Sequence, residues 1–121
     1  MRSVRSVIAL ILLTVLSATL HAQGLIVHAK PERLRHLSGM VVDPTGAMVA
    51  YTLIELRDAT DHHVIASTFG DGNGKFSFED RKRGTKLEIR VSRAGFQSVQ
   101  YAIVIGILGK EHIRVILPVA V

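Results

Sequence analysis

The chain has 121 residues, none of which is cysteine or tryptophan, and a formal net charge of +5. A length of about 100–150 residues is typical of one domain, which can bury enough apolar surface to fold alone. The lack of cysteine excludes disulfides, thiolate zinc sites, thiol nucleophiles and lipid attachment to an N-terminal cysteine.

The basic excess is modest and belongs partly to the first residues. Arg2 and Arg5 precede the first acidic residue, Glu32, and the rest of the sequence has 13 basic and 10 acidic residues. Such a balance does not by itself indicate nucleic-acid binding. Two Tyr and four Phe also offer few rings on which bases could stack.

Residues 1–22 have the three parts of a secretory signal peptide. A basic start is followed by an apolar run from Val7 to Leu20, and the small residue Ala22 ends it. The run is shorter than the roughly 20 residues that a membrane-spanning helix needs. We therefore expect cleavage after Ala22 and export to the periplasm or the extracellular space. An uncleaved anchor is the alternative, because Leu20 is large for its place three residues before the cut.

Residues 23–35 are predicted to be a flexible linker, because they lack an alternation that could bury one face. A domain is expected from His36 to Pro118. Its first strand, over residues 37–43, ends at the turn sequence D-P-T-G of residues 43–46. The next strand, over residues 49–57, has apolar side chains on both faces at its start and is predicted to be central.

The rest of the domain continues as short strands between turns. The clearest half-buried strand alternates Leu87, Ile89 and Val91 with polar residues. Further strands are expected over residues 63–69, 75–78, 97–108 and 110–117. About seven strands with turn signals about every 8–12 residues, and no helical period, predict an antiparallel sandwich or barrel.

Four motifs in order resemble a known family. They are G-M-V-V-D-P-T-G over residues 39–46, A-M-V-A-Y-T-L-I-E-L over 47–56, T-F-G-D-G-N-G-K-F-S-F over 68–78, and the later Gly84 and Gly95-Phe96. In this order the sequence resembles the carboxypeptidase regulatory-like domain family from about residue 36 to residue 117. Thr52, Arg83 and Leu87 depart from the family pattern, but Leu87 still falls on the inward face.

The resemblance implies a transthyretin-like (prealbumin-like) Greek-key β-sandwich of about seven antiparallel strands. In that family the module is usually an accessory part of carboxypeptidases, outer-membrane receptors or adhesive surface proteins, and it does not catalyse. We therefore expect a non-catalytic, secreted or envelope-associated module for protein interaction or structural support. A carbohydrate-binding module is the alternative. No catalytic, cofactor-binding or metal-binding residue is assigned, and no cofactor, nucleic acid or stable membrane span after cleavage is expected.

Two motifs suggest a metal but are not assigned as sites. His62 and His63 are neighbours, and neighbouring side chains on a strand point to opposite faces, so they cannot readily hold one ion. Residues 71–74, D-G-N-G, resemble the front of a calcium loop, but its twelfth position is Lys82 instead of glutamate. The family hairpin accounts for this segment.

Three further features bear on partners. Arg81-Lys82-Arg83 with Lys86 forms a basic cluster that could meet an acidic glycan, a phospholipid headgroup or a protein, although exposed charge runs are usually solvated. The apolar runs 102–108 and 115–121 are either core or an interface for an envelope protein or a second copy, through edge pairing of the last strands. The aromatic residues available to a glycan are mostly expected inside: Tyr51, Phe69, Phe96 and Tyr101.

Overall fold

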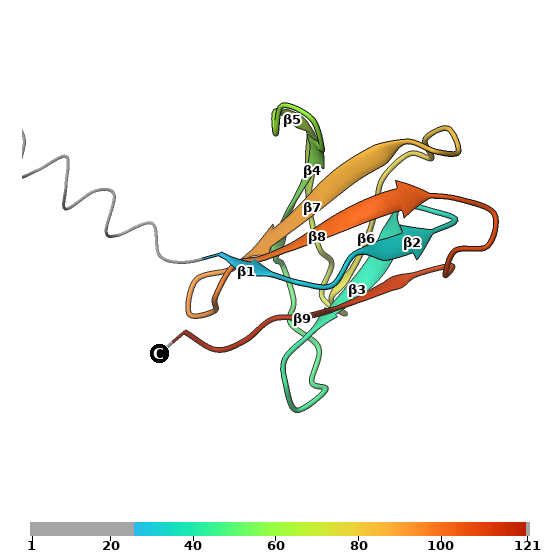
Figure 1. Cartoon of the computed structure of the whole chain (residues 1–121). Coiled ribbons are helices and arrows are strands. Elements are labelled where there is room, and N and C mark those ends of the chain that lie inside the picture. Colours follow the sequence, from blue (N-terminus) through green and yellow to red (C-terminus); the bar gives the residue numbers. More distant parts are fainter. Residues whose placement is uncertain (1–25, 121) are drawn as a thin grey trace, which may run out of the picture.

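The computed structural model describes residues 26–120, which form nine β-strands and no helix (Figure 1). In chain order the strands are β1 (Val27–His28), β2 (Glu32–Leu34), β3 (Ser38–Val42), β4 (Leu53–Asp58), β5 (Val64–Phe69), β6 (Lys75–Ser77), β7 (Lys86–Ser92), β8 (Val99–Ile105) and β9 (Ile113–Ile116). In the described part no helix is long and apolar enough to cross a membrane. The predicted signal peptide, residues 1–22, lies outside the described residues.

The strands form two sheets that enclose one core. The larger sheet has the order β1-β8-β7-β4-β5, with β2 also paired to β8, and the smaller has the order β6-β3-β9. Buried side chains of both sheets form a single apolar cluster. The predicted all-β sandwich is therefore confirmed. The pairing is mixed instead of purely antiparallel, because β1 and β2 run parallel to β8 and β9 runs parallel to β3.

The predicted alternation is visible in β4 and β7. Leu87, Ile89 and Val91 of β7 are buried, and so are Ile54 and Leu56 of β4. β4 lies between β7 and β5, as expected for a central strand. These inward residues supply much of the face that the larger sheet turns to the core.

The apolar run at the end of β8 divides between core and surface. β8 is an interior strand, and its residue Ile105 is only 4% exposed. Beyond it the chain turns, and Ile107 and Leu108 are 52% and 85% exposed. Ile105 is thus a core residue, and the edge of the larger sheet next to β8 is already occupied by β1 and β2.

The segment predicted to be a linker differs from that expectation where the structure describes it. Val27 pairs with Val99, and the three residues of β2 pair with β8 from Ile103 to Ile105. Leu34 is fully buried. The segment has no alternation of apolar and polar residues of its own. Its backbone is ordered because the edge of β8 supplies hydrogen-bond partners. The local sequence pattern does not reveal such a partner.

Candidate functional site

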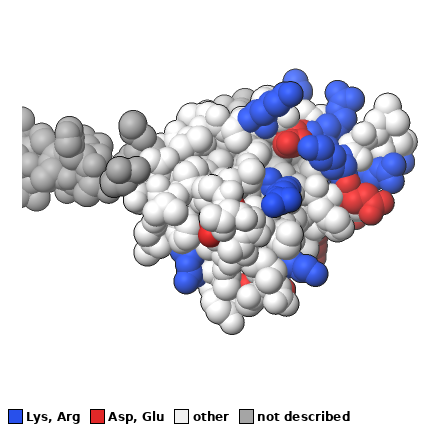
Figure 2. Space-filling model, turned by 90° about the horizontal axis from the view of Figure 1, so that it is seen from below, with Lys and Arg blue, Asp and Glu red and all other residues white. Residues whose placement is uncertain are grey.

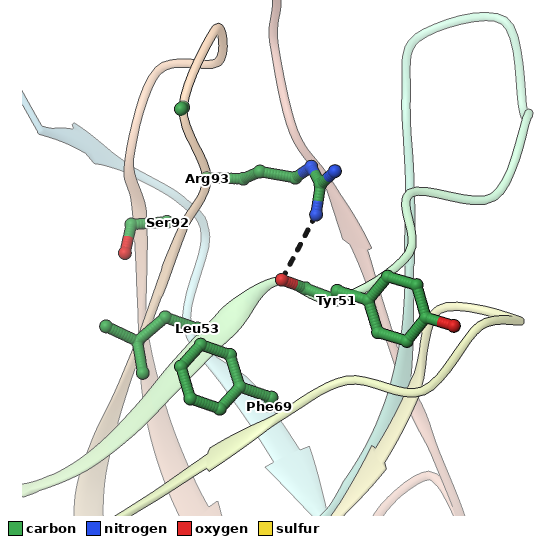
Figure 3. Close-up of a pocket in the computed structure, with 6 residues that line it drawn as sticks. Tyr51, Leu53, Phe69, Ser92 and Arg93 are labelled. Carbon is green, nitrogen blue, oxygen red and sulfur yellow. Dashed lines mark hydrogen bonds between the residues drawn. The ribbon is translucent and has the colours of Figure 1, made fainter.

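Two aromatic side chains stand exposed at one end of the larger sheet. Tyr51 is 63% exposed and Phe69 is 68% exposed. They border an open hollow of about 440 Å³, which Figure 3 shows in close-up. We call it the Tyr51–Phe69 hollow, and its lining residues are Tyr51, Leu53, Phe69, Ser92, Arg93 and Ala94.

Strand register brings the wall of this hollow together. Leu53 of β4 lies opposite Phe69 of β5 on one side and opposite Ser92 of β7 on the other. Directly opposed residues project from the same face of a sheet, and successive residues project from opposite faces. Because Ile54 is buried in the core, Leu53, Phe69 and Ser92 form a row on the outer face.

Tyr51 is held in an unusual backbone conformation just before β4. Its φ of 56° lies in the left-handed region, which residues other than glycine rarely adopt. The Tyr51 amide donates to the Asp71 carbonyl at 3.2 Å, and the Arg93 guanidinium donates to the Tyr51 carbonyl at 3.2 Å and to the Ala50 carbonyl. Figure 3 shows the bond from Arg93 to Tyr51. These contacts fix the place from which the ring projects.

Phe69 also lines a second hollow, of about 570 Å³. That hollow lies over the smaller sheet, and its lining includes Met40 of β3 and Lys75 of β6. Phe69 is therefore a ridge between two concave surfaces. An exposed aromatic side chain in such a place can contact a ligand with most of its surface.

These positions correct the expectation that most of the four aromatic side chains considered for glycan binding lie inside. Tyr101 is buried and Phe96 is partly buried, as expected, but Tyr51 and Phe69 are exposed. Phe69 falls on the outer face of an edge strand, and among residues 26–120 no further strand pairs with the free side of β5. The sequence pattern identifies the strand but not its place at the edge.

The two neighbouring histidines contact different carboxylates. His62 Nδ1 lies 2.8 Å from the Glu88 carboxylate, whereas His63 Nδ1 contacts Asp61. His63 also falls in a cluster with Asp58 and Asp61, whose possible ligand atoms lie within 4.8 Å of one another.

The carboxylates of this cluster are already used by the turn between β4 and β5. Asp58 accepts a hydrogen bond from the amide of Thr60 at 2.7 Å. Asp61 accepts one from the amide of His63 at 3.1 Å, and this bond is the main cause of the lowered pKa of Asp61. The turn accounts for the cluster, so we assign no metal to it.

The segment that resembles a calcium loop is likewise a turn. The Asp71 carboxylate accepts hydrogen bonds from the amides of Asn73 and Lys75, at 2.8 and 2.9 Å. These bonds lower the pKa of Asp71. Gly74 follows with φ of 77°, a conformation that suits glycine. The carboxylate thus holds the hairpin between β5 and β6.

The basic cluster is exposed in the loop that joins β6 to β7. Arg81, Lys82 and Arg83 precede Gly84, and Lys86 begins β7. The Gly84 amide donates to the Ile105 carbonyl at 2.8 Å, which ties this loop to the end of β8.

Comparisons with known proteins identify a family and a fold. The model of the carboxypeptidase regulatory-like domain matches residues 36–117. No curated protein matches this chain. Among solved structures, the 3-chlorocatechol 1,2-dioxygenase of Rhodococcus opacus 1CP is similar with a TM-score of 0.51 and 13% identity, covering 74% of this chain and 67% of that one.

A second solved structure has the same degree of similarity. It is the A72G mutant of the catechol 1,2-dioxygenase of Acinetobacter radioresistens, with a TM-score of 0.51 and 10% identity. The match covers 80% of this chain but only 58% of the dioxygenase. At such identities the likeness to both dioxygenases shows the fold alone.

Proposed function

The chain belongs to the carboxypeptidase regulatory-like domain family, and from this premise we propose that it is an exported, non-catalytic module that binds a protein partner in the cell envelope. Its binding surface is the Tyr51–Phe69 hollow. The observation that carries the proposal is the exposure of both aromatic side chains beside an arginine on a fixed backbone.

The composition of the hollow supports a protein interface. Tyr, Phe and Arg are enriched at the centres of protein interfaces, and Tyr and Arg are frequent hot spots. Leu53 adds an apolar side chain to the lining of the hollow. Since hydrogen bonds fix the backbone of Tyr51 and strand pairing fixes that of Phe69, little backbone entropy is lost when a partner covers the two rings.

The same lining supports a non-catalytic role. The hollow contains one hydroxyl from Ser92, one phenol from Tyr51 and one guanidinium from Arg93, and its lining has no histidine or carboxylate to serve as a general base. The guanidinium is engaged by two backbone carbonyls. A hollow with exposed aromatic rings, and with its arginine held by the backbone, is suited to binding a ligand.

Site-specific photocrosslinking tests the proposal. A photoreactive amino acid replaces Phe69 in the full chain, and the matched control replaces Val119, which is 58% exposed. We expect a discrete protein adduct from position 69 in cells that export the chain, and none from position 119. With the identified partner purified, Phe69→Ala weakens binding by about 30-fold, as for a hot spot worth about 2 kcal/mol. Unchanged affinity in Phe69→Ala contradicts the proposal.

Carbohydrate binding is the second candidate, and the same two exposed rings favour it. Aromatic faces offer apolar surface to a sugar ring, and Ser92 and Arg93 lie beside them as polar groups. A glycan array probed with the full chain distinguishes the two functions. A glycan whose binding is lost in Phe69→Ala, without any protein adduct at position 69, favours carbohydrate over protein.

A further inference from the structure

A separate surface, at the opposite end of the larger sheet, combines positive charge with exposed apolar side chains. It consists of residues 32–35, 79–86 and 104–111, which we call the basic end. Hydrogen bonds join its segments, from the Gly106 amide to the Leu34 carbonyl at 2.9 Å and from the Lys110 amide to the Arg33 carbonyl at 2.9 Å. It is therefore one structured surface made from three parts of the chain.

An apolar tip projects from this surface. Ile107 and Leu108, which are 52% and 85% exposed, occupy the turn after β8. The Gly109 amide donates to the Gly106 carbonyl at 3.1 Å, and Arg35 Nε donates to the Ile107 carbonyl at 2.8 Å. Hydrogen bonds to the carbonyls of Gly106 and Ile107 thus hold the tip in place, while its side chains remain in solvent.

The basic end carries the whole excess of positive charge among residues 26–120. It has seven basic and four acidic residues, whereas the remainder of the described chain has six of each. Figure 2 shows Lys and Arg gathered at the right-hand end of the molecule, with a smaller group of acidic atoms among them. The seven basic residues are Arg33, Arg35, Arg81, Lys82, Arg83, Lys86 and Lys110.

Three acidic residues of the basic end already have partners. Glu32 pairs with Lys110 at 3.2 Å, Glu111 with Arg35 at 3.5 Å, and Asp80 with His36 at 3.2 Å. Within residues 26–120 the other five basic side chains have no carboxylate within the 4.0 Å of an ion pair: they are Arg33, Arg81, Lys82, Arg83 and Lys86.

The arginines lie beside the apolar tip. Two shallow hollows, of about 470 and 320 Å³, are both lined by Arg83 and Ile107. Arg81 lines the larger one, and Arg33 and Leu108 line the smaller one. Guanidinium groups and apolar side chains therefore reach the same small area of surface.

We propose that the basic end docks on a membrane surface that contains anionic lipid, with Ile107 and Leu108 entering the boundary between headgroups and acyl chains. Interfacial binding scales with buried apolar area plus attraction to anionic lipid, and both are present here. Each Lys or Arg close to an anionic leaflet adds to the attraction. An acidic glycan would account for the charge but not for the exposed Ile107 and Leu108. This surface is distinct from the Tyr51–Phe69 hollow.

The cysteine-free sequence permits a site-specific test in the full chain. Leu108→Cys carries a fluorophore whose emission shifts to the blue in apolar surroundings, and Met48→Cys, at a residue 57% exposed in the turn after β3, is the matched control. We expect a blue shift at position 108 with vesicles of phosphatidylcholine and phosphatidylglycerol, and none with phosphatidylcholine alone. Position 48 shows no shift with either. Because the dye reports its own surroundings, a shift at position 108 without one at position 48 locates the apolar contact at the tip.

Charge reversal provides the second arm. Arg81→Glu with Arg83→Glu lowers the apparent affinity of labelled position 108 for anionic vesicles by about 30-fold or more, since two basic residues together contribute about 2 kcal/mol near such a surface. Lys75→Glu with Arg114→Glu, which reverses two exposed charges of the smaller sheet, has a smaller effect. Thermal unfolding of each variant verifies that it folds.

Three outcomes overturn the proposal. The first is the absence of a shift at position 108 with anionic vesicles, and the second is an equal shift at positions 108 and 48. The third is a shift produced by a soluble acidic polysaccharide but not by vesicles, which assigns the basic end to a glycan.

Discussion

The Tyr101 hydroxyl accepts a hydrogen bond from the Ile116 amide at 3.4 Å, which links β8 of the larger sheet to β9 of the smaller one. Tyr101 is buried, and burial raises the pKa of its phenol above the ordinary value of 10.0. The cross-sheet contact thus places a titratable group inside the core, where only its neutral form is well accommodated.

We expect this phenol to make stability depend on alkaline pH. Because its pKa is raised in the folded state, its contribution is fully present below pH 10.0 and is lost as the pH rises through the folded pKa. Tyr51→Phe leaves Tyr101 as the single tyrosine, so absorbance of the tyrosinate reports its pKa directly. A midpoint at or below 10.0 would show that the phenol is not buried as described.

Ile105 and Leu108 separate the core part of the apolar run from its exposed part. Ile105 is 4% exposed and Leu108 is 85% exposed. Ile105→Ala should lower the free energy of unfolding by about 2–5 kcal/mol, because it removes buried methylene groups and leaves a cavity. Leu108→Ala should change it by no more than about 0.5 kcal/mol. Urea unfolding of both variants measures the difference, and equal effects would contradict the assignment of Ile105 to the core.

Gly39 of β3 leaves no room for a side chain between Ile113 of β9 and Phe76 of β6 in the smaller sheet. A Cβ atom at this position would lie 2.5 Å from Ile113 Cγ2 and 2.8 Å from Phe76 Cζ. Gly39→Ala should therefore destabilise the domain by about 1–3 kcal/mol through overpacking between β3 and its neighbours. At Gly106 the nearest atom to such a Cβ is Arg33 Cδ at 3.5 Å, so Gly106→Ala is the control. Denaturant unfolding should separate the two variants, and a neutral Gly39→Ala would mean that the sheet relaxes freely.

The inward pattern of the strands could be predicted from sequence because it has a period of two residues. Ile54 and Leu56 in β4, and Leu87, Ile89 and Val91 in β7, are buried as that period requires. This two-residue period does not indicate which residues of other segments cover the outer face of the sheet. Glu88 alternates with these residues and faces outward, yet its side chain is buried beside His62. This contact depends on the position of His62, which lies in the turn between β4 and β5, 26 residues earlier in the chain.

The two proposed binding surfaces depend on which strands lie at the edges of the sheets, and the local sequence pattern does not indicate this. Phe69 is exposed because it lies on the outer face of β5, which is an edge strand among residues 26–120. Leu34 is buried because β2 fills the free side of β8. The basic cluster of residues 81–83 was identifiable as a run of charge. Its position beside Ile107 is created by the pairing of β7 with β8, whose register sequence alone does not specify.

Asp71 should make the stability of the hairpin between β5 and β6 depend on acid pH. Hydrogen bonds from the Lys75 and Asn73 amides lower the pKa of this carboxyl below 3.8. Its stabilising contribution is therefore present above pH 3.8 and is lost as the pH falls through the folded pKa. Asp71→Ala should lower the melting temperature at neutral pH, and its difference from the native chain should shrink at the acid end. Glu79→Ala removes a similar charge from an exposed site and is the control. Melting curves that keep the same separation at every pH would contradict this role for the carboxylate.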